Sequence, residues 1–190
     1  SQNLYAETMK LEKEPDEFKI YNLFKMAADA GYIKAKINIA LCYYEGFFFI
    51  FNVEKAKEIL LELASNGNAD AMYHLGKICY EIYTETYGNC SRQNRAELEY
   101  CEEWLEKAIE KDQTDAMAVL GYIYYFNHSW YRDARDMYLM GSEKGNVECQ
   151  CLLANWYSVD GDKEQCVRWY KEAASRGSKK AREWLEINLN

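Results

Sequence analysis

The chain has almost no proline, few histidines and no excess of positive charge. Its 190 residues include one proline, Pro15, and two histidines. Because proline breaks helices, no helix after residue 15 is interrupted in this way. The 23 Lys and Arg residues are outnumbered by 31 Asp and Glu residues, which gives a net charge of -8. This balance excludes a basic stripe that neutralises phosphates, so we expect no nucleic-acid partner.

Long apolar runs are also missing. The longest, residues 47–51 (FFFIF), has five residues, far fewer than the roughly 20 that span a bilayer. We therefore expect no membrane insertion. The seven cysteines form an odd, dispersed set, unlike the even framework of a small secreted domain. No charged-then-apolar leader precedes residue 20, and we expect a cytoplasmic protein. A periplasmic or secreted protein is the alternative if a leader has been removed.

Four segments of the chain share one pattern of small and large residues. Each begins with a small residue, has a large aliphatic residue four positions on, and has another small residue directly after it. The segments are AKINIALCYYEG from Ala35, AMYHLGKICYEI from Ala71, AMAVLGYIYYFN from Ala116 and CQCLLANWYSVD from Cys149. Since these positions lie on one helical face, each segment is predicted to form an amphipathic helix.

A second amphipathic stretch follows each segment and in most cases ends at a glycine. Gly31, Gly67, Gly145 and Gly177 stand where a helix needs a left-handed C-terminal cap, and Asp112 takes this place once. The starts are 36, 45 and 33 residues apart, and 32 more lead to Ala181. Helical pairs of this length bury their apolar faces by stacking on their neighbours. The predicted fold class is all-α.

These repeats resemble the Sel-1-like repeat family, relatives of the tetratricopeptide repeats. The resemblance rests on AMAVLGYIYY, RWYKEAASRG, KAKEILLELASNG and FKMAADAG, and it runs from about residue 16 to residue 190. It implies a bacterial origin and a single α/α solenoid, or superhelix, of about four helix-turn-helix repeats within residues 1–190. The implied parts are an N-terminal half-repeat (16–34), four repeats (35–70, 71–115, 116–148 and 149–180) and a C-terminal capping helix (181–190).

The resemblance also carries an expectation about function. Family members are similar to non-enzymatic scaffolds and adaptors, and some bacterial members resemble immunity proteins that neutralise secreted toxins. The chain is therefore expected to be a scaffold or adaptor that binds a protein partner. The alternative is an immunity or inhibitor protein that neutralises a cognate bacterial toxin or secreted effector enzyme.

One strip of each first helix falls outside the arc that faces neighbouring helices. Its members stand two, six and nine residues after each start, at about 200°, 240° and 180° around the helix. The strip contains Ile37, Leu41, Tyr44, Tyr73, Lys77, Tyr80, Ala118, Tyr122, Tyr125, Cys151, Asn155 and Ser158. The resemblance implies that the first helices line the concave side of the solenoid. Because tyrosine is favoured at binding hot spots, the strip then predicts a tyrosine-rich groove on that side. The candidate protein-binding residues in it are Tyr44, Tyr73, Lys77, Tyr80, Tyr122 and Tyr125. Packing of these tyrosines between repeats is the alternative.

The FFFIF run is predicted to be an inter-helix loop. By its place in the repeat, Gly46 is the loop glycine, Phe49 takes a buried position and Asn52 caps the next helix. The remaining aromatic residues Phe47, Phe48 and Phe51 have no such assigned place. They either cover the core or form a partner contact.

Residues 71–115 carry ten acidic and five basic side chains. The glutamates of their second helix, which include Glu102 and Glu103, are expected to form a solvated face, supported by a Glu103–Lys107 pair; a docking patch for a cationic partner is the alternative. A long polar loop is expected from Tyr83 to Arg95.

No constellation in the sequence indicates catalysis. His74 and His128 lie in different repeats, so neither a zinc site nor a Cys-His nucleophile is supported. Cys101, Cys149 and Cys166 stand where the repeat has small residues, which favours plain packing. No glycine-rich phosphate loop is present. We predict a non-enzymatic protein without catalytic residues, cofactors or metal ligands.

Overall fold

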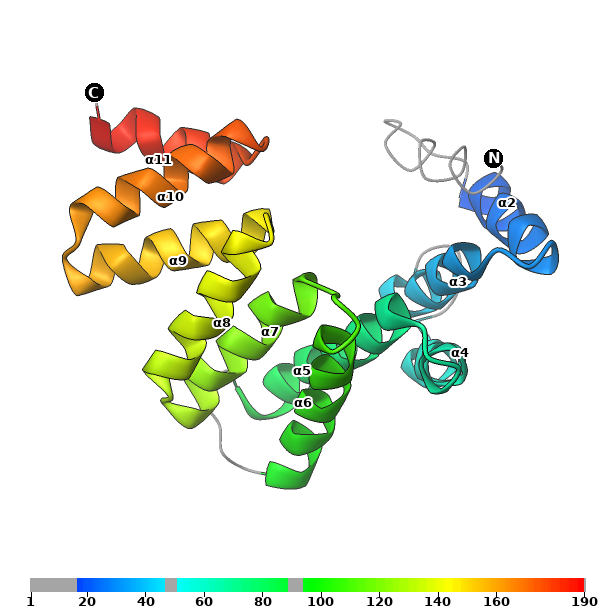
Figure 1. The fold of residues 1–190 in the computed structure, drawn as a ribbon. Helices are drawn as coiled ribbons and strands as arrows, with labels where there is room; N and C mark the ends of the chain where they lie inside the picture. The colour runs from blue at the N-terminus through cyan, green and yellow to red at the C-terminus, as the bar shows by residue number, and fades with distance from the viewer. Residues whose placement is uncertain (1–16, 47–50, 89–93, 190) are drawn as a thin grey trace. The chain divides into compact units, whose positions relative to one another are not determined.

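The computed structural model describes residues 17–46, 51–88 and 94–189, and in these ranges the chain is helical with no strand (Figure 1). The helices are α2 (Glu17–Asp29), α3 (Ile33–Glu45), α4 (Val53–Ser65), α5 (Ala69–Tyr87), α6 (Arg95–Ile109), α7 (Asp115–Ile123), the π-helix η1 (Tyr124–His128), α8 (Tyr131–Glu143), α9 (Val147–Asp160), α10 (Lys163–Ser175) and α11 (Lys179–Leu189). The predicted all-α class of paired helices is confirmed. None of the described helices is both long and apolar enough to cross a membrane.

The chain divides into two compact units, and the division falls within α5. Unit 1 ends at Leu75 and unit 2 begins at Gly76. In unit 1, α3 packs on α2 and on α4. In unit 2, α7, α8, α9, α10 and α11 stack in chain order, each on the one before it (Figure 1).

The turn between one helical pair and the next has the same construction throughout the chain. Each of the four predicted glycines has a positive φ, between +85° and +100°. At Gly145 the glycine N–H donates to the Ser142 carbonyl at 3.0 Å, and Asn146 N–H donates to the Gly141 carbonyl at 2.9 Å. This pair of bonds satisfies carbonyls that the helix end leaves without partners. Asp112 adopts the same left-handed conformation at φ +64°, as predicted.

At two of these turns, the residue after the glycine caps the start of the next helix. The side-chain oxygens of Asn68 and Asn146 accept bonds from Ala71 N–H and Cys149 N–H, each at 2.8 Å. A Gly-Asn dipeptide therefore ends one helix and caps the next. Asn52 caps α4 in the same way, because its side chain accepts a bond from Lys55 N–H at 2.9 Å, which confirms the prediction for Asn52.

The small residues of the repeat permit close helix packing. A Cβ added at Gly76 would lie 2.8 Å from Cγ of Leu105, and one at Gly121 would lie 2.3 Å from Cε1 of Tyr138. Ala40 and Ala154 are completely buried at the equivalent positions. The predicted packing cysteines Cys101, Cys149 and Cys166 are also buried. The first helix of each repeat can thus approach its neighbours closely.

The polar loop predicted from Tyr83 is wrong at its start. Helix α5 continues to Tyr87, and Tyr83 is buried, so the polar loop predicted from Tyr83 begins at least one helical turn later. Asn127, although polar, lies in the π-helix η1 and is fully buried. In the extended part of α5, the buried ring of Tyr83 contacts that of Tyr87, four residues later, with centroids 5.2 Å apart.

Candidate functional site

The structure places the predicted binding residues in both units. Tyr44 and Tyr73 lie in unit 1, whereas Lys77, Tyr80, Tyr122 and Tyr125 lie in unit 2, and all six are half-buried. Phe47 and Phe48 lie outside the described residues, as does Phe49. Phe51 is 58% exposed and its ring centroid lies 6.1 Å from that of Tyr44.

Unit 2 carries two adjoining hollows that share a wall. The first has a volume of about 340 Å³ and lies between α5 and the segment from α7 to η1; it is lined by Lys77, Tyr80, Glu81, Thr84, Val119, Tyr122 and Phe126. The second has a volume of about 190 Å³ and is lined by Tyr122, Tyr125, Phe126, Tyr138, Leu152, Asn155, Trp156 and Val159. Tyr122 and Phe126 belong to both. We call the two hollows together the aromatic groove.

Ring contacts hold the shared wall of the aromatic groove in place. The rings of Tyr122 and Phe126 stack with centroids 5.7 Å apart. Tyr138 meets Tyr122 edge-on at 6.4 Å, and Tyr125 meets Phe126 edge-on at 4.9 Å. Tyr138 is buried, and this burial raises the pKa of its hydroxyl. The groove therefore has a buried aromatic floor and a partly exposed, mutually supported aromatic wall.

The π-helix η1 positions the groove residues Tyr125 and Phe126. It contains Tyr124–His128, and beyond it the Trp130 N–H donates to the Tyr124 carbonyl at 2.8 Å. The wider π turn directs Asn127 inward, where its Oδ1 accepts a hydrogen bond from the Tyr80 hydroxyl at 2.9 Å. This bond fixes α5 to η1. Such π turns occur frequently at functional sites.

Tyr80 is consequently both a lining residue and a structural one. In addition to its bond with buried Asn127, its ring stacks on that of Tyr83 at 6.4 Å. A substitution of Tyr80 would change stability as well as the groove. Phe126, which is 37% exposed, is the better residue with which to test the surface.

The groove carries little net charge. In the first hollow Lys77 Nζ lies 3.7 Å from a carboxylate oxygen of Glu81. None of the described residues that line the second hollow is charged. At its edge the Arg135 guanidinium lies 5.6 Å from the centre of the Trp156 ring and pairs with Asp136 at 2.8 Å.

The residues that line the aromatic groove overlap with the predicted strip but are not identical to it. The strip residues Lys77, Tyr80, Tyr122, Tyr125 and Asn155, six or nine residues after their starts, line the groove. Ile37, Ala118 and Cys151, two residues after their starts, are buried. Positions three and ten residues on, such as Val119 and Phe126, line the groove instead. The lining arc is thus centred nearer 250° than 200°. Including these two positions would have identified Phe126 and Val159 from the sequence.

Two other groove residues, Tyr138 and Trp156, were harder to identify from the sequence pattern. Tyr138 comes from a second helix, α8, which the strip did not include. Trp156 stands seven residues after Cys149. This position was predicted to lie in the arc that faces neighbouring helices, outside the strip.

The acidic helix α6 is less uniformly solvated than predicted. Lys107 and Glu103 do form an ion pair at 2.6 Å. Glu102, however, bonds to Nε2 of His128 with both side chains largely buried. Burial raises the pKa of the Glu102 carboxyl, and the contact with His128 opposes this shift. The prediction that Glu102 belongs to the solvated face is wrong, because η1 covers it.

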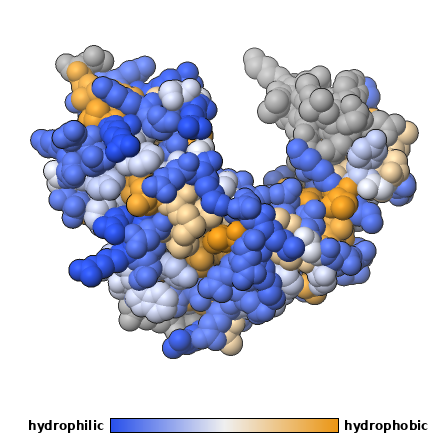
Figure 2. Space-filling model, in the orientation of Figure 1, coloured by the Kyte–Doolittle hydropathy of each residue, from blue (hydrophilic) through white to orange (hydrophobic). Residues whose placement is uncertain are grey.

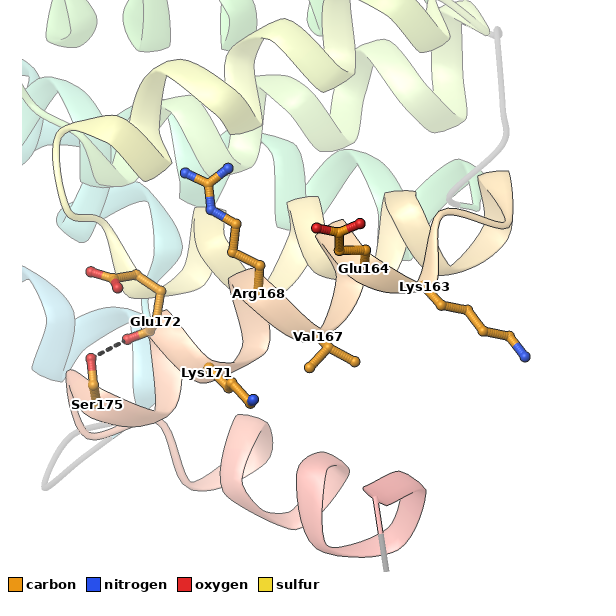
Figure 3. A pocket seen from close by; sticks show the side chains of 7 residues that line it. All are labelled: Lys163, Glu164, Val167, Arg168, Lys171, Glu172 and Ser175. Carbon is orange, nitrogen blue, oxygen red and sulfur yellow. Dashed lines mark hydrogen bonds between the residues drawn. The ribbon is translucent and has the colours of Figure 1, made fainter.

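A third hollow, of about 680 Å³, lies on α10 alone (Figure 3). It is lined by Lys163, Glu164, Val167, Arg168, Lys171, Glu172 and Ser175. Ser175 donates a hydrogen bond to the Glu172 carbonyl at 2.7 Å, and Arg176 pairs with the Glu172 carboxylate at 3.0 Å. One helix supplies every lining side chain, so this surface is an open, charged helix face. In the described ranges no group of three or more His, Cys, Asp or Glu side chains could hold a metal ion.

Comparison with known proteins shows which fold this is. The Sel1 repeat protein from Oxalobacter formigenes matches with a TM-score of 0.70 and 22% identity, over 97% of this chain and 75% of that one. Immunity protein Pa5087 from Pseudomonas aeruginosa matches with a TM-score of 0.73 and 17% identity, over 95% of this chain and 66% of that one. The chain therefore has the fold of Sel1-repeat proteins, as the resemblance implied.

A curated sequence matches over a shorter segment. Chitin synthase regulatory factor 2 of Schizosaccharomyces pombe is 33% identical over 73 residues, which are 38% of this chain and 14% of that protein. No family model matches the chain.

Proposed function

We propose that the chain is a non-enzymatic scaffold or adaptor that binds a protein partner through the aromatic groove of unit 2. The observation that carries this proposal is the shared wall of Tyr122 and Phe126, which is stacked, partly exposed and placed between two hollows. Rings that are already fixed by their neighbours lose little conformational freedom when a partner covers them. On the face seen in Figure 2, hydrophobic residues occur as small patches among many hydrophilic ones. On this face, local pockets therefore suit a partner better than a broad apolar interface does.

The immunity or inhibitor role is the second candidate. It is favoured by the likeness to immunity protein Pa5087, which extends over 95% of this chain. An inhibitor should bind one target with nanomolar affinity or better, whereas an adaptor is expected to bind more weakly and to several partners. A toxin gene next to the gene for this chain would favour the inhibitor.

Unit 1 supplies a second proposed contact. Phe51 and Tyr44 lie together with Phe51 well exposed. The other residues proposed for this contact are Tyr73 and, from the sequence alone, Phe47 and Phe48. If this surface binds the partner, Phe51→Ser weakens binding and leaves the melting temperature unchanged. A lower melting temperature with unchanged binding would assign Phe51 to the core instead.

The experiment that tests the groove is affinity capture from native lysate with a matched pair of variants. Phe126→Ser removes a groove ring that is 37% exposed, and Tyr100→Ser removes a ring on α6 that is 38% exposed and outside the groove. Captured proteins are measured by quantitative mass spectrometry, and circular dichroism verifies that both variants are folded. We expect Phe126→Ser to lose a discrete partner that wild type and Tyr100→Ser retain.

Equal loss in both variants, or retention in both, would contradict the groove proposal. Turnover of a substrate by the purified chain alone would contradict both binding roles.

A further inference from the structure

The aromatic groove is neutral, and this restricts the chemistry of its occupant. A cationic anchor such as a partner arginine finds no carboxylate among the described residues that line the second hollow. Arg135 already lies against the Trp156 ring at the edge of that hollow. An anionic anchor finds only Lys77, which is paired with Glu81. Aliphatic or ring-shaped uncharged side chains are therefore the anchors that fit.

Two hydroxyl groups distinguish among uncharged occupants. Within the described residues, the hydroxyls of Tyr122 and Tyr125 have no hydrogen-bond partner. By contrast, the Tyr80 hydroxyl is bonded to Asn127. A phenol that becomes covered when a ligand binds needs a hydrogen-bond partner there, because leaving it unpaired costs free energy.

The backbone conformation of the ligand decides whether it can supply those partners. In a helical ligand, nearly all carbonyls are already bonded within the helix. A polyproline II segment has no internal hydrogen bonds, so its carbonyls are available to donors such as tyrosine hydroxyls. Its proline rings are rigid and uncharged, and aromatic-lined grooves bind such segments in several recognition domains.

We propose that the occupant of the aromatic groove is a proline-rich segment of the partner, bound in the polyproline II conformation. Proline or aliphatic side chains enter the two hollows on either side of the wall formed by Tyr122 and Phe126. Tyr122 and Tyr125 donate hydrogen bonds to backbone carbonyls of the segment. This inference rests on the proposed function, since it assumes that the groove is the binding surface.

The test uses the full chain and two labelled synthetic peptides. One peptide consists of repeated Leu-Pro-Pro, and the other has alanine in place of every proline, which keeps it apolar but favours a helix. Binding is measured by fluorescence anisotropy with wild type, Phe126→Ser, Tyr100→Ser, Tyr122→Phe and Tyr125→Phe. The two Phe variants keep the rings and remove only the hydroxyls.

We expect the proline peptide to bind more tightly than the alanine peptide. Phe126→Ser should weaken its binding by about tenfold or more, as expected for a hot-spot ring. Tyr122→Phe and Tyr125→Phe should each weaken it by about threefold to tenfold, the range for one hydrogen bond. Tyr100→Ser should not change it. Since the groove is neutral, the affinity should change by less than about twofold between low and high salt.

Tighter binding of the alanine peptide would overturn the inference and indicate a helical occupant. Equal affinity of wild type and the two Phe variants would also overturn it, because the hydroxyls would then take no part. If neither peptide binds while Phe126→Ser still loses a captured partner from lysate, the inference fails and the proposed function stands. If that capture also shows no dependence on Phe126, the proposed function fails as well.

Discussion

Replacing Gly121 by alanine would place a methyl group against the buried ring that forms the floor of the aromatic groove. The added Cβ would lie 2.3 Å from Cε1, 2.8 Å from Cδ1 and 3.0 Å from Cζ of Tyr138. Tyr138 is 4% exposed and its ring meets Tyr122 edge-on. The ring therefore cannot move away without displacing the groove wall.

Two opposing effects decide the sign of the change in stability. Alanine is favoured over glycine inside a helix by about 1 kcal/mol. Overpacking of a rigid core costs about 1–3 kcal/mol, and contact with three ring atoms indicates the upper part of this range. We therefore expect Gly121→Ala to lower the free energy of unfolding by about 1–2 kcal/mol.

The assay is urea denaturation followed by circular dichroism, with Tyr138→Leu and the double variant completing a cycle. Leucine lacks the ring atoms that would clash, so the double variant should be more stable than the sum of the single changes predicts, by about 1 kcal/mol or more. A Gly121→Ala chain more stable than wild type would refute the close packing described for Gly121 and Tyr138.

Three further predictions test other parts of the structure. Asn52→Ala should lower the free energy of unfolding by about 1 kcal/mol, because α4 loses its cap to Lys55 N–H; an unchanged urea midpoint would contradict this. Burial raises the pKa of the Cys149 thiol to about 12, so iodoacetamide should alkylate Cys149 only after unfolding, as measured by peptide mapping. Rapid labelling of Cys149 in the native protein would refute its burial. Burial raises the pKa of Glu102 above its usual 4.5, so the folded state holds that proton more tightly than the unfolded state. Wild type should therefore lose stability relative to Glu102→Gln as the pH rises through and above 4.5. A stability difference between the two chains that is constant with pH would oppose this.

The helical pairs could be predicted because local signals agree with packing. The glycines at 31, 67, 145 and 177 and the asparagines that follow two of them define the turns by backbone conformation and capping alone. The small residues at Gly76 and Gly121 predict close approach without reference to the partner helix. These features depend on residues that are close together in the sequence, so they can be recognised from one sequence alone.

The details of the groove depend on contacts between segments far apart in the sequence. Asn127 is a polar residue in a segment that resembles a loop, and only its bond with Tyr80, 47 positions away, explains its burial in a π-helix. The spacing of Glu102 along its helix is that of a solvated face, but in the structure it contacts His128 and is largely buried. The groove lining lies about one side-chain position around the helix from the predicted strip. Sequence periodicity does not show on which side the neighbouring helices pack.

The central claim is that a protein partner contacts the aromatic groove, and photo-crosslinking from Phe126 tests it most directly. A photoreactive benzoylphenylalanine replaces Phe126 in one sample and Tyr100 in a matched control, and both are irradiated in native lysate. Crosslinked products are identified by mass spectrometry. The account predicts a discrete partner crosslinked from position 126 and absent from position 100. Crosslinking of the same partner from position 100 with none from position 126 would contradict it.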